Sequence, residues 1–347
     1  MKHINVALFV PHAGCPHACS FCNQKTISGK SRPLCAEEID EAVKTALSTA
    51  DCNKGEIAFF GGSFTAINRD YMVSLLERAK HYIDKGLFSG IRISTRPDCI
   101  DREILTILKD YGVTAIELGC QSMDDEVLRL NKRGHTAENV ACAARLIKEF
   151  GFEFGVQMMT GLFGDTQEKC IETAKKLIAL SPDTARIYPT VVLEGTELAE
   201  LYRQGRYVPE SVEDASSLCA ELLLLFRRAG VRVIRLGLHS GGNVEEGYVA
   251  GAYHPAFREI CESKIPLALK YFLDNNAQIK RICLYFDNDF AGCRGAEALQ
   301  NILGGMYEVR YIPPPVGKDY NDYLIKRMND ERTKNSEKIQ SENQRNA

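Results

Sequence analysis

The sequence has 347 residues, enough to bury a substantial core and to form one large domain with an appendage. Hydrophobic residues make up 45% and charged residues 26%, which agrees with a soluble enzyme, and no apolar stretch is long enough to span a membrane. The net charge of -3 excludes a broad positive field that would attract nucleic acid, although a local basic patch remains compatible with it.

The N-terminal residues predict a strand at Asn5–Val10 rather than a cleavable signal, so we expect a cytoplasmic protein. The 13 cysteines support this expectation, because they form no disulfide-like framework and free thiols need a reducing compartment. The sequence leaves the oligomeric state open.

Short apolar runs alternate with amphipathic segments along most of the chain, which predicts an α/β architecture with a parallel sheet. Each amphipathic segment carries apolar residues at three- and four-residue spacing, as a helix packed on a sheet does. We predict strands at 6–10, 57–60, 91–94, 115–118, 154–158, 185–188 and 231–236, and helices at 71–85, 101–111, 137–150 and 167–180.

Three cysteines follow the first predicted strand within eight residues: Cys15, Cys19 and Cys22. A 4Fe-4S cluster normally takes four thiolates, so a loop with three leaves one iron open to a small molecule. S-adenosylmethionine (SAM) suits that iron, because its amino and carboxylate groups can chelate it. One electron from the cluster then breaks the sulfonium bond and releases a 5'-deoxyadenosyl radical.

A structural zinc site is the alternative interpretation, and three ordinary thiols are another. Zinc requires four ligands, usually as two spaced pairs, and here only His12 or His17 could complete the set. No second Cys-x-x-Cys pair occurs downstream, which favours the iron-sulfur cluster. Phe21 supports the same interpretation, since an apolar ring before the last cysteine can shield a cluster and pack near adenine.

The cysteine loop resembles that of the radical SAM superfamily, and later segments resemble the catalytic subunit of the Elongator complex and its bacterial and archaeal relatives. The resemblance covers residues 1 to about 262 and implies a partial (β/α)6 barrel, in which ligands gather at the carboxyl ends of the strands. The segments that carry it are Ser94–Asp98, Glu117–Ser122, Asn131–Thr136, Arg186–Thr190 and Glu194–Leu198.

The same resemblance assigns SAM contacts to several strand ends. The segment 61–65 is similar to the superfamily's glycine-rich motif, in which exposed amides meet the methionine part of SAM; a tight turn is the alternative. The segment 161–164 resembles the adenine-binding segment, where small residues leave a slot for a flat base. We therefore expect SAM to contact Phe21, Gly61, Gly62, Ser63, Thr65, Ser94, Arg96, Gln121, Gly161 and Gly164.

Other polar residues on the predicted strands allow two interpretations each. Glu117 could face inward as a polar group or pair with Arg96. Arg186 and Tyr188 could form a substrate or radical site, although a buried tyrosine with one satisfied hydroxyl is the commoner case. The segment 131–135 could hold a phosphate backbone through its positive charge, or it could be a surface turn before a helix.

The sequence changes character after residue 262. Residues 263–327 resemble part of a Toprim domain, in which paired aspartates, here Asp287 and Asp289, hold Mg²⁺ for work on phosphates. A Toprim site also needs a glutamate after an earlier strand, and none is evident, so we expect a truncated module without its own catalysis. An Asp-Asn-Asp helix cap is the alternative. Residues 328–347 predict a disordered polar tail.

These observations predict a radical SAM enzyme that takes electrons from a flavodoxin- or ferredoxin-type donor and, by analogy, modifies a tRNA base. The Elongator subunit has a longer insertion between its first two cluster cysteines and an acetyltransferase domain that we do not expect here, which argues against uridine carboxymethylation by that route. The alternative is a nucleic-acid-binding protein with a structural cluster and a Mg²⁺-binding C-terminal segment. A third alternative is a damaged gene fusion whose barrel still folds.

Overall fold

The computed structural model divides into two compact units, Met1–Ser263 and Lys264–Ala347. The predicted ligands Cys15, Asp287 and Asp289, and the predicted tail at 328–347, lie outside the described residues. The structure describes residues 5–10, 19–23, 32–49, 52–238, 242–274, 279–286, 290–305 and 307–315.

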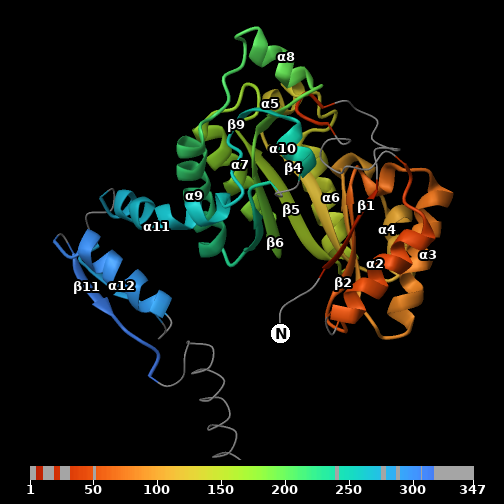
Figure 1. The fold of residues 1–347 in the computed structure, drawn as a ribbon, viewed down its shortest axis with the longest axis horizontal. Coiled ribbons are helices and arrows are strands. Elements are labelled where there is room, and N and C mark those ends of the chain that lie inside the picture. The colour runs from red at the N-terminus through yellow and green to blue at the C-terminus, as the bar shows by residue number, and fades with distance from the viewer. Residues whose placement is uncertain are drawn as a thin grey trace, which may run out of the picture. The chain divides into compact units, whose positions relative to one another are not determined.

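Seven parallel strands form one curled sheet in the first unit, in the order β1-β2-β3-β4-β5-β6-β8 (Figure 1). This sheet confirms the expected α/β partial barrel and all seven predicted strands; β8 joins the six-stranded sheet as a seventh strand at its β6 edge. The bounds are β1 Asn5–Val10, β2 Glu56–Gly61, β3 Gly90–Thr95, β4 Val113–Gln121, β5 Glu153–Thr160, β6 Thr184–Pro189 and β8 Arg232–Leu236.

Helices cover the outer face of this sheet (Figure 1). Alternate strand residues such as Ile57, Phe59 and Ile93 point to that face and are fully buried, because the side-chain period of a strand is two. The helices are α2 Ala36–Thr49, α3 Arg69–Asp84, α4 Arg102–Asp110, α5 Asp125–Leu130, α6 Ala137–Glu149, α7 Gln167–Ala179, α8 Glu197–Arg203, α9 Val212–Arg228, α10 Gly242–Glu246 and α11 Phe257–Asp274, with short 3₁₀ turns at Phe64–Ala66 and Pro97–Cys99.

The concave face of the sheet is polar. Arg92 of β3 is almost completely buried there, and its Nε donates to Glu56 Oε2 at 2.6 Å. Its Nη2 donates to Glu153 Oε1 at 2.9 Å, and its Nη1 lies 3.5 Å from Glu117 Oε1. Burial alone would lower the pKa of Arg92, but the neighbouring carboxylates outweigh it and keep the pKa above its usual value. The floor of the barrel is therefore a compensated charge network.

Two smaller sheets complete the described fold. β7 (Val191–Leu193) and β9 (Tyr248–Gly251) pair in antiparallel fashion beside the barrel, and sequence analysis missed both because three or four residues carry no clear period. In the second unit β10 (Arg281–Leu284) and β11 (Glu308–Tyr311) pair in parallel around α12 (Phe290–Leu303). The Toprim-like identity of this segment stays a prediction. Among the described residues, no helix combines the length and apolar character needed to cross a bilayer.

The charge network predicts that two arginine substitutions lower the free energy of unfolding by very different amounts. Arg92→Met removes the buried cation that faces Glu56, so we expect it to destabilise the barrel by about 3–5 kcal/mol. Arg102→Met breaks an exposed pair with Glu149 and should cost about 0–1 kcal/mol. Urea unfolding followed by circular dichroism measures both, and equal losses for the two variants would contradict the structural role given to Arg92.

Candidate active site

Backbone hydrogen bonds within the cysteine loop and from α8 fix the second half of the loop. Cys22 N donates to Cys19 O at 3.1 Å, which closes a turn between the two cysteines. Between them, Ser20 O accepts from the backbone N–H of Leu198 in α8 at 2.8 Å. Cys19 is 6% exposed, whereas Cys22 is partly exposed. The loop therefore presents its two described thiols from a fixed backbone.

Asn131, which is fully buried, connects this loop to two others. Ser20 Oγ donates to Asn131 Oδ1 at 2.8 Å, and Ser20 N donates to Asn131 O at 3.2 Å. In turn, Asn131 Nδ2 donates to Val127 O at 2.8 Å and to Phe163 O at 2.9 Å. One side chain thus joins the loops that follow β1, β4 and β5.

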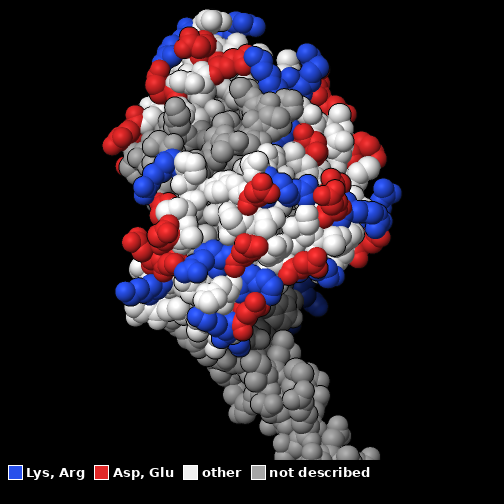
Figure 2. All heavy atoms as spheres, turned by 90° about the vertical axis from the view of Figure 1, so that its right-hand side faces the viewer, with Lys and Arg blue, Asp and Glu red and all other residues white. Residues whose placement is uncertain are grey.

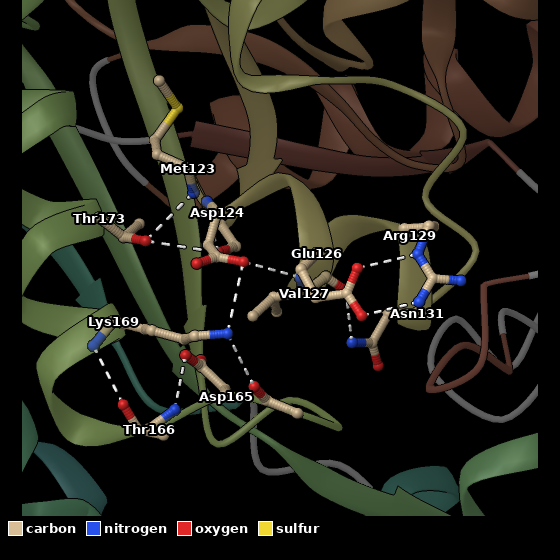
Figure 3. A network of polar contacts seen from close by, with 12 residues as sticks. Met123, Asp124, Glu126, Val127, Arg129, Asn131, Asp165, Thr166, Lys169 and Thr173 are labelled. Atoms are coloured by element: carbon tan, nitrogen blue, oxygen red, sulfur yellow. Dashed lines mark hydrogen bonds and ion pairs between the residues drawn. The ribbon is translucent and has the colours of Figure 1, made fainter.

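Figure 3 shows the polar contacts that fix the segment before Asn131. Asp124 accepts from the backbone N–H of Val127 at 2.9 Å and so caps α5, while Lys169 Nζ of α7 lies 3.5 Å from the same carboxylate. Thr173 Oγ1 accepts from the backbone N–H of Met123 at 3.1 Å. These contacts tie the end of β4 to α7.

Arg133 points at the cysteine loop from the same segment. Its side chain is buried, and its Nη1 donates to Cys19 Sγ at 3.3 Å while its Nη2 donates to Gly119 O at 2.7 Å. Asn131, Arg133 and His135 are buried, so segment 131–135 does not display an exposed phosphate-binding cluster. The alternative of a turn before a helix is confirmed, because the segment leads into Thr136, the N-cap of α6. Lys132 and Gly134 are exposed, and Lys132 Nζ pairs with Glu197 at 2.6 Å.

The glycine-rich segment makes a close approach to β1. Gly61 has φ +112°, and a Cβ at this position would lie 2.4 Å from Val10 O, so glycine is required. Beyond it, Ser63 Oγ lies 2.8 Å and Thr65 Oγ1 2.5 Å from Thr95 Oγ1. The hydroxyl groups predicted to meet SAM thus hold the ends of β2 and β3 together.

Arg96 does not pair with Glu117, which corrects one of the two sequence interpretations. Arg96 Nε and Nη2 each donate to the Asp98 carboxylate at 2.9 Å. Glu117 instead accepts from Arg186 Nε at 2.5 Å and Nη2 at 2.9 Å, and from Gln157 Nε2 at 2.8 Å. Gln157 Nε2 also donates to Ser94 Oγ at 3.1 Å. Glu117 is therefore the centre of an inward-facing network.

Arg186 and Tyr188 lie on the concave face and are partly exposed. The Arg186 guanidinium carbon lies 4.9 Å above the centre of the Phe60 ring. Burial alone would lower the pKa of Arg186, but Glu117 and Tyr188 outweigh it and raise that pKa, while burial raises the pKa of Tyr188. An arginine, a tyrosine and an aromatic ring thus face the hollow side of the sheet.

The predicted adenine segment is fixed by the chain between α8 and α9. Tyr207 Oη donates to Gly161 O at 2.6 Å, and a Cβ on Gly161, which has φ +67°, would lie 2.7 Å from Glu210 Oε2. Gly164 is confined too, since a Cβ there would lie 2.4 Å from Leu130 Cδ1. Both glycines have positive φ, +67° and +80°, so a larger residue at either position would strain the backbone.

Three predicted SAM contacts remain, and one of them, Gly62, donates its backbone N–H to Val10 O at 3.3 Å. Phe21 packs with Phe163 against an apolar cluster that includes Leu198 and Tyr207. Gln121 has a left-handed backbone, φ +63°, at an irregularity in the pairing of β4 with β5, where the strand ends. The backbone of Gln121 therefore departs from strand geometry at the point where β4 ends.

The described donors fit an iron-sulfur cluster. Cys19 and Cys22 share one turn, and Cys15 lies outside the described residues, so no group of three metal-ligating side chains occurs in the part of the chain that the structure covers. Arg133 Nε is buried without a hydrogen-bond partner in the same part, beside Cys19 Sγ. Two thiols in one turn, with an N–H donor directed at one of the sulfurs, are the kind of donor set that iron-sulfur clusters use.

Two family models match this chain. Residues 9–177 match the Radical SAM superfamily, and residues 182–266 match a Radical_SAM C-terminal domain. A solved structure of Methanocaldococcus infernus Elp3 superposes with a TM-score of 0.62, covering 82% of this chain and 67% of that one at 21% identity. The structural likeness supports the partial barrel.

Curated relatives match about half of the chain. A tRNA uridine(34) acetyltransferase of Dehalococcoides mccartyi is 34% identical over 193 residues, which is 50% of this chain and 42% of that protein. The human Elongator complex protein 3 is also 34% identical over 193 residues, 50% of this chain and 35% of that protein. The chain thus spans less than half the length of these two relatives.

Burial of His135 predicts a pH dependence of stability. Desolvation, with the charges of Arg133 and Arg96, lowers the pKa of His135 to about 3. The unfolded chain binds a proton near pH 6.5 and the folded chain only near pH 3, so stability should fall by up to about 1.4 kcal/mol per pH unit as pH drops through that window.

Urea unfolding between pH 7 and pH 5 measures this slope. We expect His135→Gln to flatten it, while His81→Gln, at an exposed position in α3, leaves it unchanged. An identical slope in the wild type and His135→Gln would show that another group titrates.

Proposed function

We propose a specific reaction on the premise that this chain is an enzyme of the radical SAM type, as its matched residues 9–177 and 182–266 support. Cys15, Cys19 and Cys22 bind a 4Fe-4S cluster, and the chain cleaves SAM reductively. One observation carries this proposal. Arg133 contacts Cys19, and the tight turn at Gly61 lies against the end of β1, so all three residues lie at the carboxyl ends of the strands.

When bound, the cluster would supply the electron that breaks the SAM sulfonium bond and yields a 5'-deoxyadenosyl radical. The protein's own residues bind and orient the cosubstrate. Phe21 and the apolar cluster behind it exclude water from one side of the loop. The other SAM contacts that we propose are Gly61, Gly62, Ser63, Thr65, Ser94, Arg96, Gln121, Gly161 and Gly164.

The substrate reaches the radical from the concave face of the sheet. Arg186, Tyr188 and Phe60 are partly exposed there, and a flat base can stack on an aromatic ring or a guanidinium plane. We therefore propose a tRNA base as the substrate, in line with the similarity to the tRNA uridine(34) acetyltransferase of Dehalococcoides mccartyi. Because the alignment covers only part of that protein, its acetyltransferase activity is not carried over.

We further propose that a reductant of the flavodoxin or ferredoxin type supplies the electron.

On the face drawn in Figure 2, acidic and basic side chains are interspersed, so no broad field of one sign covers that face. With a net charge of -3 on the whole chain, we propose that an RNA binds through local contacts rather than through long-range attraction.

Formation of 5'-deoxyadenosine tests the proposed reaction. Anaerobically reconstituted protein with dithionite and SAM should release it, with or without added tRNA, and Cys19→Ala should abolish the product. Cys142→Ala, on the outer helix α6, is the matched control and should behave as wild type. A protein that holds about four irons per chain yet yields no 5'-deoxyadenosine, even with tRNA present, would contradict the proposal.

A further inference from the structure

Arg133 is a buried cation without an opposite charge in the described part of the chain. It is 7% exposed, no carboxylate among the described residues forms an ion pair with it, and its Nε has no hydrogen-bond partner there. Its neighbour Arg96 is different, because Asp98 neutralises that guanidinium in a two-bond pair. A buried charge without compensation is costly, so Arg133 indicates an anionic group at this position.

The orientation of Arg133 is fixed by its surroundings. Its Nη2 donates to Gly119 O at 2.7 Å, and its backbone N donates to Leu128 O at 3.0 Å. Its own carbonyl accepts a hydrogen bond from Arg96 Nη2. With the guanidinium held in this way, Nη1 is directed at Cys19 Sγ, 3.3 Å away.

We propose that Arg133 is a positioning residue that sets the reduction potential of the cluster. The inference rests on the proposed cluster at Cys15, Cys19 and Cys22. Hydrogen bonds to ligand sulfurs and nearby charge set the potential of such clusters. When a reductant gives up one electron to the cluster, the added negative charge is stabilised by the adjacent guanidinium. Arg133 therefore raises the midpoint potential and lets a biological donor reduce the cluster.

A merely structural role would leave the potential unchanged. The same hydrogen bond could hold the loop in place without affecting the cluster, and loss of activity in a variant would not distinguish the two roles. The midpoint potential measured without SAM does distinguish them, because it reports on the charge and the hydrogen bonds around the cluster alone.

The test is a redox titration of full-length, anaerobically reconstituted protein, monitored by electron paramagnetic resonance without SAM. Arg133→Met removes the charge and the donor, while Arg133→Gln keeps an N–H donor without the charge. Arg129→Met is the matched control, since it removes one positive charge from an exposed side chain, 68% accessible, that pairs with Glu126. Iron per chain is measured for every variant.

We expect Arg133→Met to bind as much iron as wild type and to have a lower midpoint potential. The midpoint potential of Arg133→Gln should lie between those of wild type and Arg133→Met, and that of Arg129→Met should equal the wild-type value. A full cluster in Arg133→Met with an unchanged potential would overturn the proposal. So would loss of the cluster from both Arg133 variants but not from Arg129→Met, because Arg133 would then govern assembly. If the wild type itself holds no iron, the proposed function fails and this inference fails with it.

Discussion

The polar interior of the barrel depends on one buried carboxylate, Glu117, which is 1% exposed in the middle of β4. A charge removed from water must be compensated, and Arg186, Gln157 and Arg92 do so from three other strands. Gly155 leaves space for the group, since a Cβ there would lie 2.9 Å from Glu117 Cγ. The polar interior therefore consists of one buried carboxylate, the side chains that compensate it and the space that Gly155 leaves.

Above this interior, the candidate site is assembled from loops that are far apart in sequence. Ser20 and Asn131 are separated by 111 positions, and Cys19 and Arg133 by 114. The described residues of the cysteine loop, 19–23, form no helix or strand, and their backbone bonds to Asn131 and Leu198. This arrangement ties the cysteine loop to the ends of β4 and β5, where the cosubstrate is proposed to bind.

The regular elements could be predicted from the sequence, because apolar periodicity is a local property, and all seven strands of the main sheet were predicted. Side-chain partners were harder to predict. Glu117 pairs with Arg186 rather than Arg96 because the parallel register places Ser94, not Arg96, opposite Glu117. Arg133 was interpreted as a surface charge because a basic residue in a loop usually is one. Its buried side chain contacts Gly119, 14 positions away, and Cys19, 114 positions away, and no local pattern encodes the second contact.

The central claim is that three cysteines hold a cluster with one iron open to SAM. Mössbauer spectroscopy of protein reconstituted with ⁵⁷Fe, recorded with and without SAM, tests it most directly. The account predicts a 4Fe-4S spectrum in which one iron site changes when SAM is added, because only that site lacks a thiolate. A cluster spectrum that SAM leaves unchanged, or a protein that takes up zinc in place of iron, would contradict it.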